Sequence, residues 1–182
     1  MSEPPTHVTT AAEISLRPAG PADADVLYQI YASTREEELA VVPWDAPAKE
    51  AFLRMQFAAQ HTDYHARYPD ASYDLVMTGE QVLGRLYVHR GETGWQVLDI
   101  ALLPEHRGKG IGARLMTEVL AGAGAAGKRV QIHVERFNPA QHLYDRLGFR
   151  QIADQGVYLL LEWQPGAAGP PAGLGGYPNT TS

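Results

Sequence analysis

The sequence of 182 residues contains no cysteine, no run of Lys or Arg longer than a pair and no long apolar stretch. Without cysteine, the chain has no disulfide framework, no thiolate metal site and no cysteine nucleophile, which fits a reducing compartment. With 15 Lys and Arg against 21 Asp and Glu, it also lacks the basic surface that tight nucleic-acid binding requires. No stretch approaches the roughly 18 apolar residues of a membrane span. The acidic start MSEPPTHVTTAAE is unlike a signal peptide. We therefore expect a cytoplasmic protein with neither nucleic-acid nor membrane partners.

Composition divides the chain into three zones. Residues 1–13 carry two prolines and almost nothing apolar, which predicts a disordered lead-in. Residues 164–182 are dominated by Gly, Pro and Ala, and such a segment cannot offset its ordering entropy by burial. The chain as a whole is 45% hydrophobic, which is ordinary for a globular protein, and most of its large apolar residues lie in segment 14–163. We expect this segment to form one folded domain that holds the function.

Changes of hydrophobic period within residues 14–163 predict the elements. Strands are expected at 14–17, 73–77, 82–89, 95–103, 129–134, 149–153 and 157–161. A first helix is expected around 26–31, and a second after Asp45, with Phe52, Met55 and Ala59 on its buried face. A third helix should begin after Gly110. The fourth should have Asn138 as its N-cap and end at Gly148. The order βααβββαβαββ predicts an α+β fold with one mixed sheet. Because a helix crosses over between them, strands 95–103 and 129–134 should be parallel neighbours.

The glycine-rich segment Arg107-Gly108-Lys109-Gly110-Ile111-Gly112 follows an apolar strand and leads directly into a helix. Main-chain amides at the start of a helix can bind a phosphate or pyrophosphate, and at the glycines no side chain covers them. Arg107 and Lys109 add positive charge. A tight turn without ligand would also use glycine. Gly108, Gly110 and Ala113 satisfy the dinucleotide pattern G-x-G-x-x-A, but Pro104 to Arg107 intervene after the strand, which argues against that fold.

This loop resembles the Q/R-x-x-G-x-G/A motif of the GCN5-related N-acetyltransferase (GNAT) superfamily. Asn138-Pro139-Ala140-Gln141-His142-Leu143-Tyr144-Asp145-Arg146-Leu147-Gly148-Phe149 is similar to the family's second motif, N-x-x-A-x-x-L-Y-x-x-L-G-F. The two motifs occur in the family's order on the expected elements. The resemblance implies a three-layer α/β GNAT fold whose sheet splays between the fourth and fifth strands, over about residues 14–162.

The resemblance also implies acetyl-CoA as co-substrate and assigns residues to it. Leu102 and Leu103 would pair with the pantetheine arm through main-chain groups. The pyrophosphate would lie on the amides of Arg107, Gly108, Lys109, Gly110, Ile111 and Gly112, and Asn138 would reach the pantetheine. The implied activity is transfer of the acetyl group to a primary amine of a small molecule, or to a protein amino group, by direct attack in a ternary complex. The alternative is a non-catalytic acyl-CoA-binding sensor or interaction module with the same fold.

Two residues are candidates for catalysis. By resemblance, Tyr144 would donate a proton or hydrogen bond to the departing thiolate, which a phenol can do; its helical spacing from Ala140 and Leu147 would also suit a packing role. Asp99 stands in an otherwise apolar strand, where an unpaired carboxylate is costly. It is therefore either paired, for example with an arginine, or turned to the site as general base or water relay.

The acceptor side is expected at the first two helices, where Glu37, Glu38 and Trp44 could receive a cationic amine. A solvated acidic face is the competing interpretation of the run Glu36 to Glu38. His61 and His65 have i, i+4 spacing, but no third ligand accompanies them, so no metal is expected. Segment 158–163 could offer an edge strand for a homodimer.

Overall fold

The computed structural model describes residues 13–166, and its secondary structure follows the expected order closely. The strands are β1 (Ile14–Pro18), β2 (Ser72–Thr78), β3 (Gln81–Arg90), β4 (Trp95–Leu102), β5 (Val130–Glu135), β6 (Arg150–Gln155) and β7 (Tyr158–Trp163). The helices are α1 (Ala24–Ser33), α2 (Glu36–Ala40), α3 (Ala46–Arg67), α4 (Ile111–Ala125) and α5 (Gln141–Arg146), with short 3-10 turns η1 (Pro21–Asp23) and η2 (Pro104–His106). The predicted disordered segments lie almost entirely outside the described residues, at 1–12 and 167–182. None of the described helices is long and apolar enough to span a membrane.

The strands form a mixed sheet in the order β1-β2-β3-β4-β5-β7-β6, and the predicted α+β class with a parallel β4–β5 pair is confirmed. The chain divides into two compact units that share β4. Among the described residues, the first contains 13–89 and 98–112, and the second contains 90–97 and 113–166. The parallel pairing between β4 and β5 is short: it joins Trp95–Val97 of β4 to Val130–Ile132 of β5.

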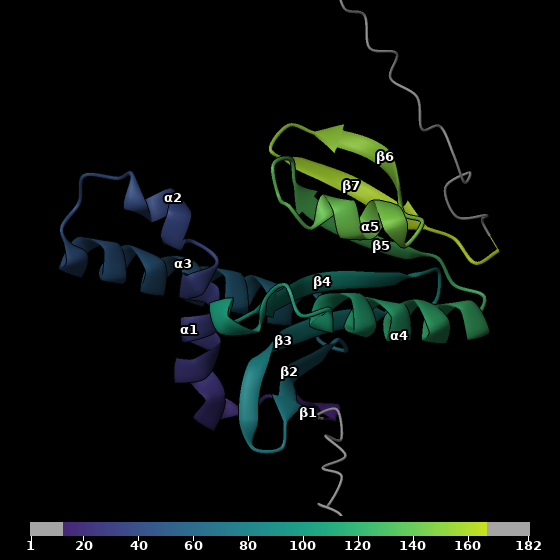
Figure 1. The fold of residues 1–182 in the computed structure, drawn as a ribbon, viewed down its shortest axis with the longest axis horizontal. Helices are drawn as coiled ribbons and strands as arrows, with labels where there is room; N and C mark the ends of the chain where they lie inside the picture. Colours follow the sequence, from purple (N-terminus) through teal and green to yellow (C-terminus); the bar gives the residue numbers. More distant parts are fainter. Residues whose placement is uncertain (1–12, 167–182) are drawn as a thin grey trace, which may run out of the picture. The chain divides into compact units, whose positions relative to one another are not determined.

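In the first unit, β1 and β3 both pair antiparallel with β2. The helices α1 and α3 lie next to each other (Figure 1). They pack through Phe57 of α3, whose ring lies 5.9 and 5.7 Å between centroids from Tyr28 and Tyr31 of α1. The core residues come from α1 and three strands: Leu27, Ile30, Leu75, Met77, Tyr87 and Ala101. Each buried aliphatic side chain of this kind contributes about 1.5–3 kcal/mol to stability.

Helix α3 begins where the sequence predicts, because the Asp45 carboxylate accepts the Ala48 amide at 2.8 Å as an N-cap. The predicted buried face is wrong. Met55 is 58% exposed, and Phe57 and Tyr64 pack against the core instead. The short helix α2 was not expected from the sequence.

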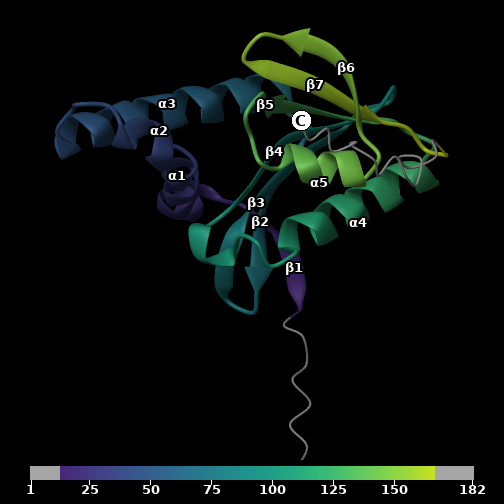
Figure 2. The ribbon, with the colours of Figure 1, turned by 45° about the horizontal axis from the view of Figure 1, so that its top comes forward.

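In the second unit, β7 lies between β5 and β6 and pairs antiparallel with both. Segment 158–163 is therefore not the edge strand that the sequence suggested for a homodimer. Helix α5 lies beside this part of the sheet (Figure 2). It is shorter than predicted and starts at Gln141, because Asn138 bonds the Ala140 amide within a turn rather than capping a helix. Its end is as predicted: Gly148 has φ +91°, and Phe149 N–H donates to the Tyr144 carbonyl.

Candidate active site

The loop between β4 and α4 has the backbone geometry of an anion cradle. Gly108 and Gly110 adopt φ values of +70° and +79°, and a Cβ at either position would meet nothing within 4 Å. Glycine is therefore required here for conformation and not for space. The amides of Gly108, Lys109 and Gly110 make no backbone hydrogen bond to the described residues. The first N–H groups of α4, from Ile111 and Gly112, have no partner within the helix. Consecutive amides of this kind bind phosphate oxygens.

The side chain of Arg107 folds back along its own unit. Its Nε donates to the Leu102 carbonyl at 2.8 Å, and its Nη2 donates to the Ser33 carbonyl and hydroxyl at 3.1 and 3.0 Å. Ser33 is the last residue of α1, so this one guanidinium joins the end of β4, the loop and the end of α1. The sequence predicted Arg107 as a phosphate partner and missed its contact with Ser33.

Gly84 allows β3 to approach the end of β4 closely. A Cβ at Gly84 would lie 2.2 Å from the Ala101 carbonyl oxygen and 2.9 Å from Leu102 Cα, which is sterically impossible without movement of β4. Leu103 N–H donates to the Leu83 carbonyl at 2.9 Å, so β3 also fixes the chain beyond β4. Leu102, whose carbonyl holds Arg107, retains a second lone pair for another donor.

Asp99 forms an ion pair with a buried arginine, the first of the two situations that the sequence left open. Arg85 Nη2 lies 2.5 Å from Asp99 Oδ2 and 3.1 Å from Gln60 Oε1. The Arg85 side chain is 2% exposed and that of Asp99 is 15% exposed. Burial by itself lowers the pKa of the Arg85 guanidinium, but the Asp99 carboxylate outweighs it and the net pKa lies above the ordinary value. The partner could have been inferred, since Arg85 and Asp99 are each a lone charge in an apolar stretch of neighbouring strands.

The second unit holds the residues of the second motif. Tyr144 on α5 is 4% exposed, and its ring packs edge-on against Phe149 at 5.6 Å between centroids. Asn138 lies in the turn before α5, and its Oδ1 accepts the Ala140 amide at 2.8 Å. This bond orients the Asn138 side chain and leaves its amide N–H groups for another partner.

The acidic residues proposed for the acceptor lie on α2. Glu37 is exposed, and Glu38 forms an exposed ion pair with Arg35 at 2.8 Å, so the solvated-face interpretation fits Glu38. Trp44 is 47% exposed and packs edge-on against Phe52 at 5.3 Å. His61 and His65 lie next to each other on α3 with ring centroids 4.4 Å apart. Within residues 13–166, no group of three or more His, Asp or Glu side chains could hold a metal ion.

Part of the chain is similar to a known family. Residues 71–151 match the family described as acetyltransferase (GNAT) domain. No curated protein matches the chain at a significant level. The fold is similar to that of the PaiA N-acetyltransferase from Thermoplasma acidophilum in complex with coenzyme A, with a TM-score of 0.64 and 17% identity over 84% of this chain and 99% of that one.

Two further solved structures share the fold. An acetyltransferase from Thermus thermophilus has a TM-score of 0.60 and 22% identity over 83% of this chain and 96% of that one. A histone acetyltransferase HPA2 and related acetyltransferase from Corynebacterium glutamicum has a TM-score of 0.60 and 21% identity over 84% and 96%. These structures confirm the GNAT fold. The family match over residues 71–151 confirms the resemblance to the GNAT superfamily and supports acetyl-CoA-dependent acetyl transfer as the general activity.

Proposed function

From the GNAT domain at residues 71–151 and the GNAT fold of the described chain, we propose that this protein is an N-acetyltransferase. It transfers the acetyl group of acetyl-CoA to a primary amine, on a small molecule or on a protein, by direct attack in a ternary complex. The observation that carries the proposal is the loop of positive-φ glycines at the start of α4, whose amides suit the pyrophosphate of the coenzyme.

The loop binds the coenzyme mainly through main-chain groups of Gly108, Lys109, Gly110, Ile111 and Gly112. The Lys109 ammonium adds charge complementarity to the pyrophosphate, and Arg107 holds the loop in place through Leu102 and Ser33. Leu102 and Leu103 present main-chain groups to the pantetheine, and Asn138 offers its side-chain amide to the same arm.

The bound thioester supplies the acetyl carbonyl and a thiol leaving group. The amine nitrogen forms a bond to the carbonyl carbon while the bond from that carbon to sulfur breaks. Tyr144 donates its phenolic proton to the departing sulfur, because a phenol kept neutral at physiological pH is a suitable general acid. Without cysteine, the chain has no thiol of its own to form a cysteinyl acyl-enzyme.

The acceptor amine has to lose a proton before or during attack. We assign Asp99 as the base or as the holder of a water that relays the proton. Its Oδ2 is bound to Arg85, which fixes the carboxylate, and Oδ1 is the atom for the relay. Glu37, Glu38 and Trp44 form the proposed acceptor side, where two carboxylates and an aromatic face attract a cationic amine.

Two measurements on the full chain test the proposal. Calorimetry should show saturable binding of acetyl-CoA at micromolar to millimolar concentration, and absence of binding would contradict the assignment of the loop. Release of coenzyme A can be followed with a thiol reagent without background, since the protein has no cysteine. The acceptors to be screened are polyamines, aminoglycosides, amino acids and peptides with a free N-terminus. If acetyl-CoA binds but none of these acceptors causes release of coenzyme A, the non-catalytic acyl-CoA-binding module would be favoured.

A further inference from the structure

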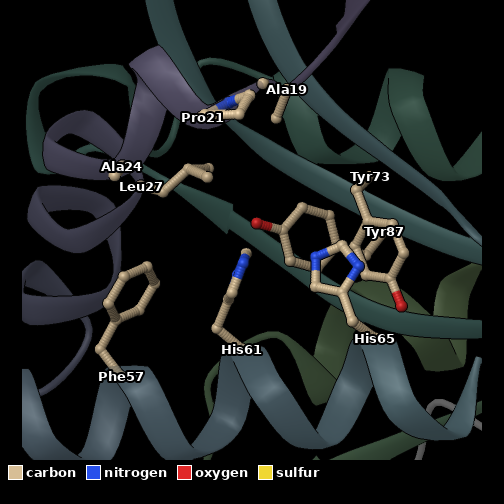
Figure 3. Close-up of a pocket in the computed structure, with 10 residues that line it drawn as sticks. Ala19, Pro21, Ala24, Leu27, Phe57, His61, His65, Tyr73 and Tyr87 are labelled. Atoms are coloured by element: carbon tan, nitrogen blue, oxygen red, sulfur yellow. The ribbon is translucent and has the colours of Figure 1, made fainter. Parts of the chain in front are cut away.

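A cavity lies in the first unit, between the helices α1 and α3 and the sheet. Its volume is about 350 Å³, within the range of small-molecule sites. It is lined by side chains from α1, α3, β2 and β3, and by the chain between β1 and α1. Figure 3 shows His61 and Phe57 rising from α3 into this space, opposite Leu27 and Tyr87. No residue of the loop 107–112 lines it.

The cavity contains a buried hydroxyl whose proton has no acceptor among the described residues. Tyr87 is 2% exposed, and its hydroxyl makes no well-formed hydrogen bond to the described residues, although the Arg85 guanidinium lies near enough to interact with it. In Figure 3 this hydroxyl points into the space between Leu27 and His61. Arg85 can act on the hydroxyl only as a donor, so the hydroxyl proton remains available to an acceptor that enters the cavity. Burial also raises the pKa of Tyr87, and the Arg85 guanidinium only partly opposes this, so the hydroxyl remains a donor at neutral pH.

The other walls are flat and aromatic. The His65 ring stacks on Tyr73 with centroids 3.9 Å apart and an interplanar angle of 28°. The Tyr73 hydroxyl is already used, because it lies 2.8 and 3.0 Å from the carbonyls of Tyr64 and Tyr68. His61 lies between Phe57 and His65, at 5.8 and 4.4 Å between ring centroids. Tyr73 and His65 therefore offer ring faces, while Tyr87 and His61 offer the polar contacts.

The cavity suits an uncharged ligand better than a charged one. None of its lining residues is Asp, Glu, Lys or Arg. Burial, with His65 and Arg85 adding to it, lowers the pKa of His61 and keeps that ring neutral at physiological pH. The nearby Arg85 guanidinium is already paired with Asp99, so a carboxylate or ammonium group entering here would lose its hydration without a free partner for an ion pair.

We propose that this cavity is a binding site for a small uncharged molecule with a flat apolar body and one hydrogen-bond acceptor directed at the Tyr87 hydroxyl. The site is distinct from the coenzyme loop and makes no use of acetyl transfer. Its test is therefore independent of the proposed enzymatic activity.

Benzamide is the probe, because it is flat, neutral and carries a carbonyl acceptor. Benzoate is the charged analogue of nearly the same shape. We expect benzamide to shift the imidazole proton resonances of His61 and His65 saturably, with a Kd on the order of 1 mM. Benzoate should bind at least about 10-fold more weakly. Absence of any saturable benzamide shift would overturn the proposal.

The variant Tyr87→Phe separates a ligand-binding hydroxyl from a structural one. It should weaken benzamide binding about 5- to 10-fold, since one hydrogen bond is lost. Its Tm should stay unchanged or rise by about 2–4 °C, since a buried hydroxyl whose proton has no acceptor is removed. The exposed Tyr158→Phe is the matched control and should change neither quantity. A lower Tm in Tyr87→Phe together with unchanged benzamide affinity would show that the hydroxyl is structural and would refute the site.

Discussion

Arg107 Nη2 lies 3.0 Å from Ser33 Oγ, and the two residues are 74 positions apart in the sequence. Ser33 is buried at the end of α1, and its hydroxyl also donates to the Ile30 carbonyl at 2.8 Å. The rigid fork of the Arg107 guanidinium serves three oxygen acceptors, from Leu102 and Ser33. The glycine loop, which is flexible by composition, is thereby attached to the packed core of its unit.

Arg107→Lys should loosen this attachment while retaining the positive charge. A lysine has one nitrogen in place of the fork and cannot reach all three acceptors together. We expect the Kd for acetyl-CoA in calorimetry to rise about 10-fold. The control is Arg67→Lys, an exposed arginine paired with Asp63 on α3, which should leave the Kd unchanged. Equal affinities in Arg107→Lys and wild type would show that the guanidinium fork does not position the loop.

Gly110→Ala tests the backbone conformation of the loop. A non-glycine residue at φ +79° costs about 1–2 kcal/mol, so either the fold is destabilised or the loop changes shape. Gly127→Ala is a matched control, because Gly127 has φ +64°, has open space around its Cβ and follows the far end of α4. Both variants should lower the Tm, and only Gly110→Ala should weaken acetyl-CoA binding, by 10-fold or more. A similar loss of acetyl-CoA affinity in both variants would show that lower stability alone weakens binding.

The local signals in the sequence were sufficient for most of the fold. Alternating apolar residues, glycine turns and the cap at Asp45 predicted the seven strands, and every helix except α2, close to their observed positions. Where the prediction was wrong, competing local bonds or packing decided the outcome. The Asn138 side chain accepts the Ala140 amide within a turn and does not begin the helix. On α3, Phe57 packs against the core, while Met55 is exposed.

The site was less predictable because its contacts join distant segments. The positive φ angles of Gly108 and Gly110 follow from a motif that is local in sequence. The bond from Arg107 to Ser33 and the buried hydroxyl of Tyr87 depend on how α1 and α3 pack on the sheet. No periodicity in the sequence reports such packing.

Tyr144→Phe should remove the proposed general acid and leave the fold intact, since the ring and its contact with Phe149 remain. We expect kcat to fall about 100-fold or more with little change in the KM for acetyl-CoA. The measurement is thiol release across pH. The control is Tyr158→Phe, whose rate should equal that of the wild type. If kcat in Tyr144→Phe is unchanged at every pH, Tyr144 is a packing residue only.

Stability should decrease in alkaline solution through Tyr28. Its hydroxyl donates to Glu50 Oε2 at 2.6 Å, and burial together with Glu50 raises its pKa from 10.0 to about 12. The folded state therefore favours the neutral phenol. This contribution is fully present below pH 10 and is lost as the pH rises from 10 to about 12. The Tm of Tyr28→Phe should fall less steeply than that of the wild type over this interval. Parallel curves for the two proteins would contradict this assignment.

Asp99 has a structural and a proposed catalytic role, and paired variants separate them. Asp99→Ala leaves the buried Arg85 without its counter-charge and should cost about 3 kcal/mol or more in stability. Asp99→Asn keeps an oxygen for Arg85 Nη2 and should cost less. The double variant Arg85→Met/Asp99→Leu removes both charges and should recover most of the stability, because an apolar pair replaces a buried ion pair. If Asp99 relays the amine proton, Asp99→Asn and the double variant both lose kcat, while the Kd for acetyl-CoA stays close to that of the wild type. Wild-type kcat in a stably folded Asp99→Asn would leave Asp99 with the structural role alone.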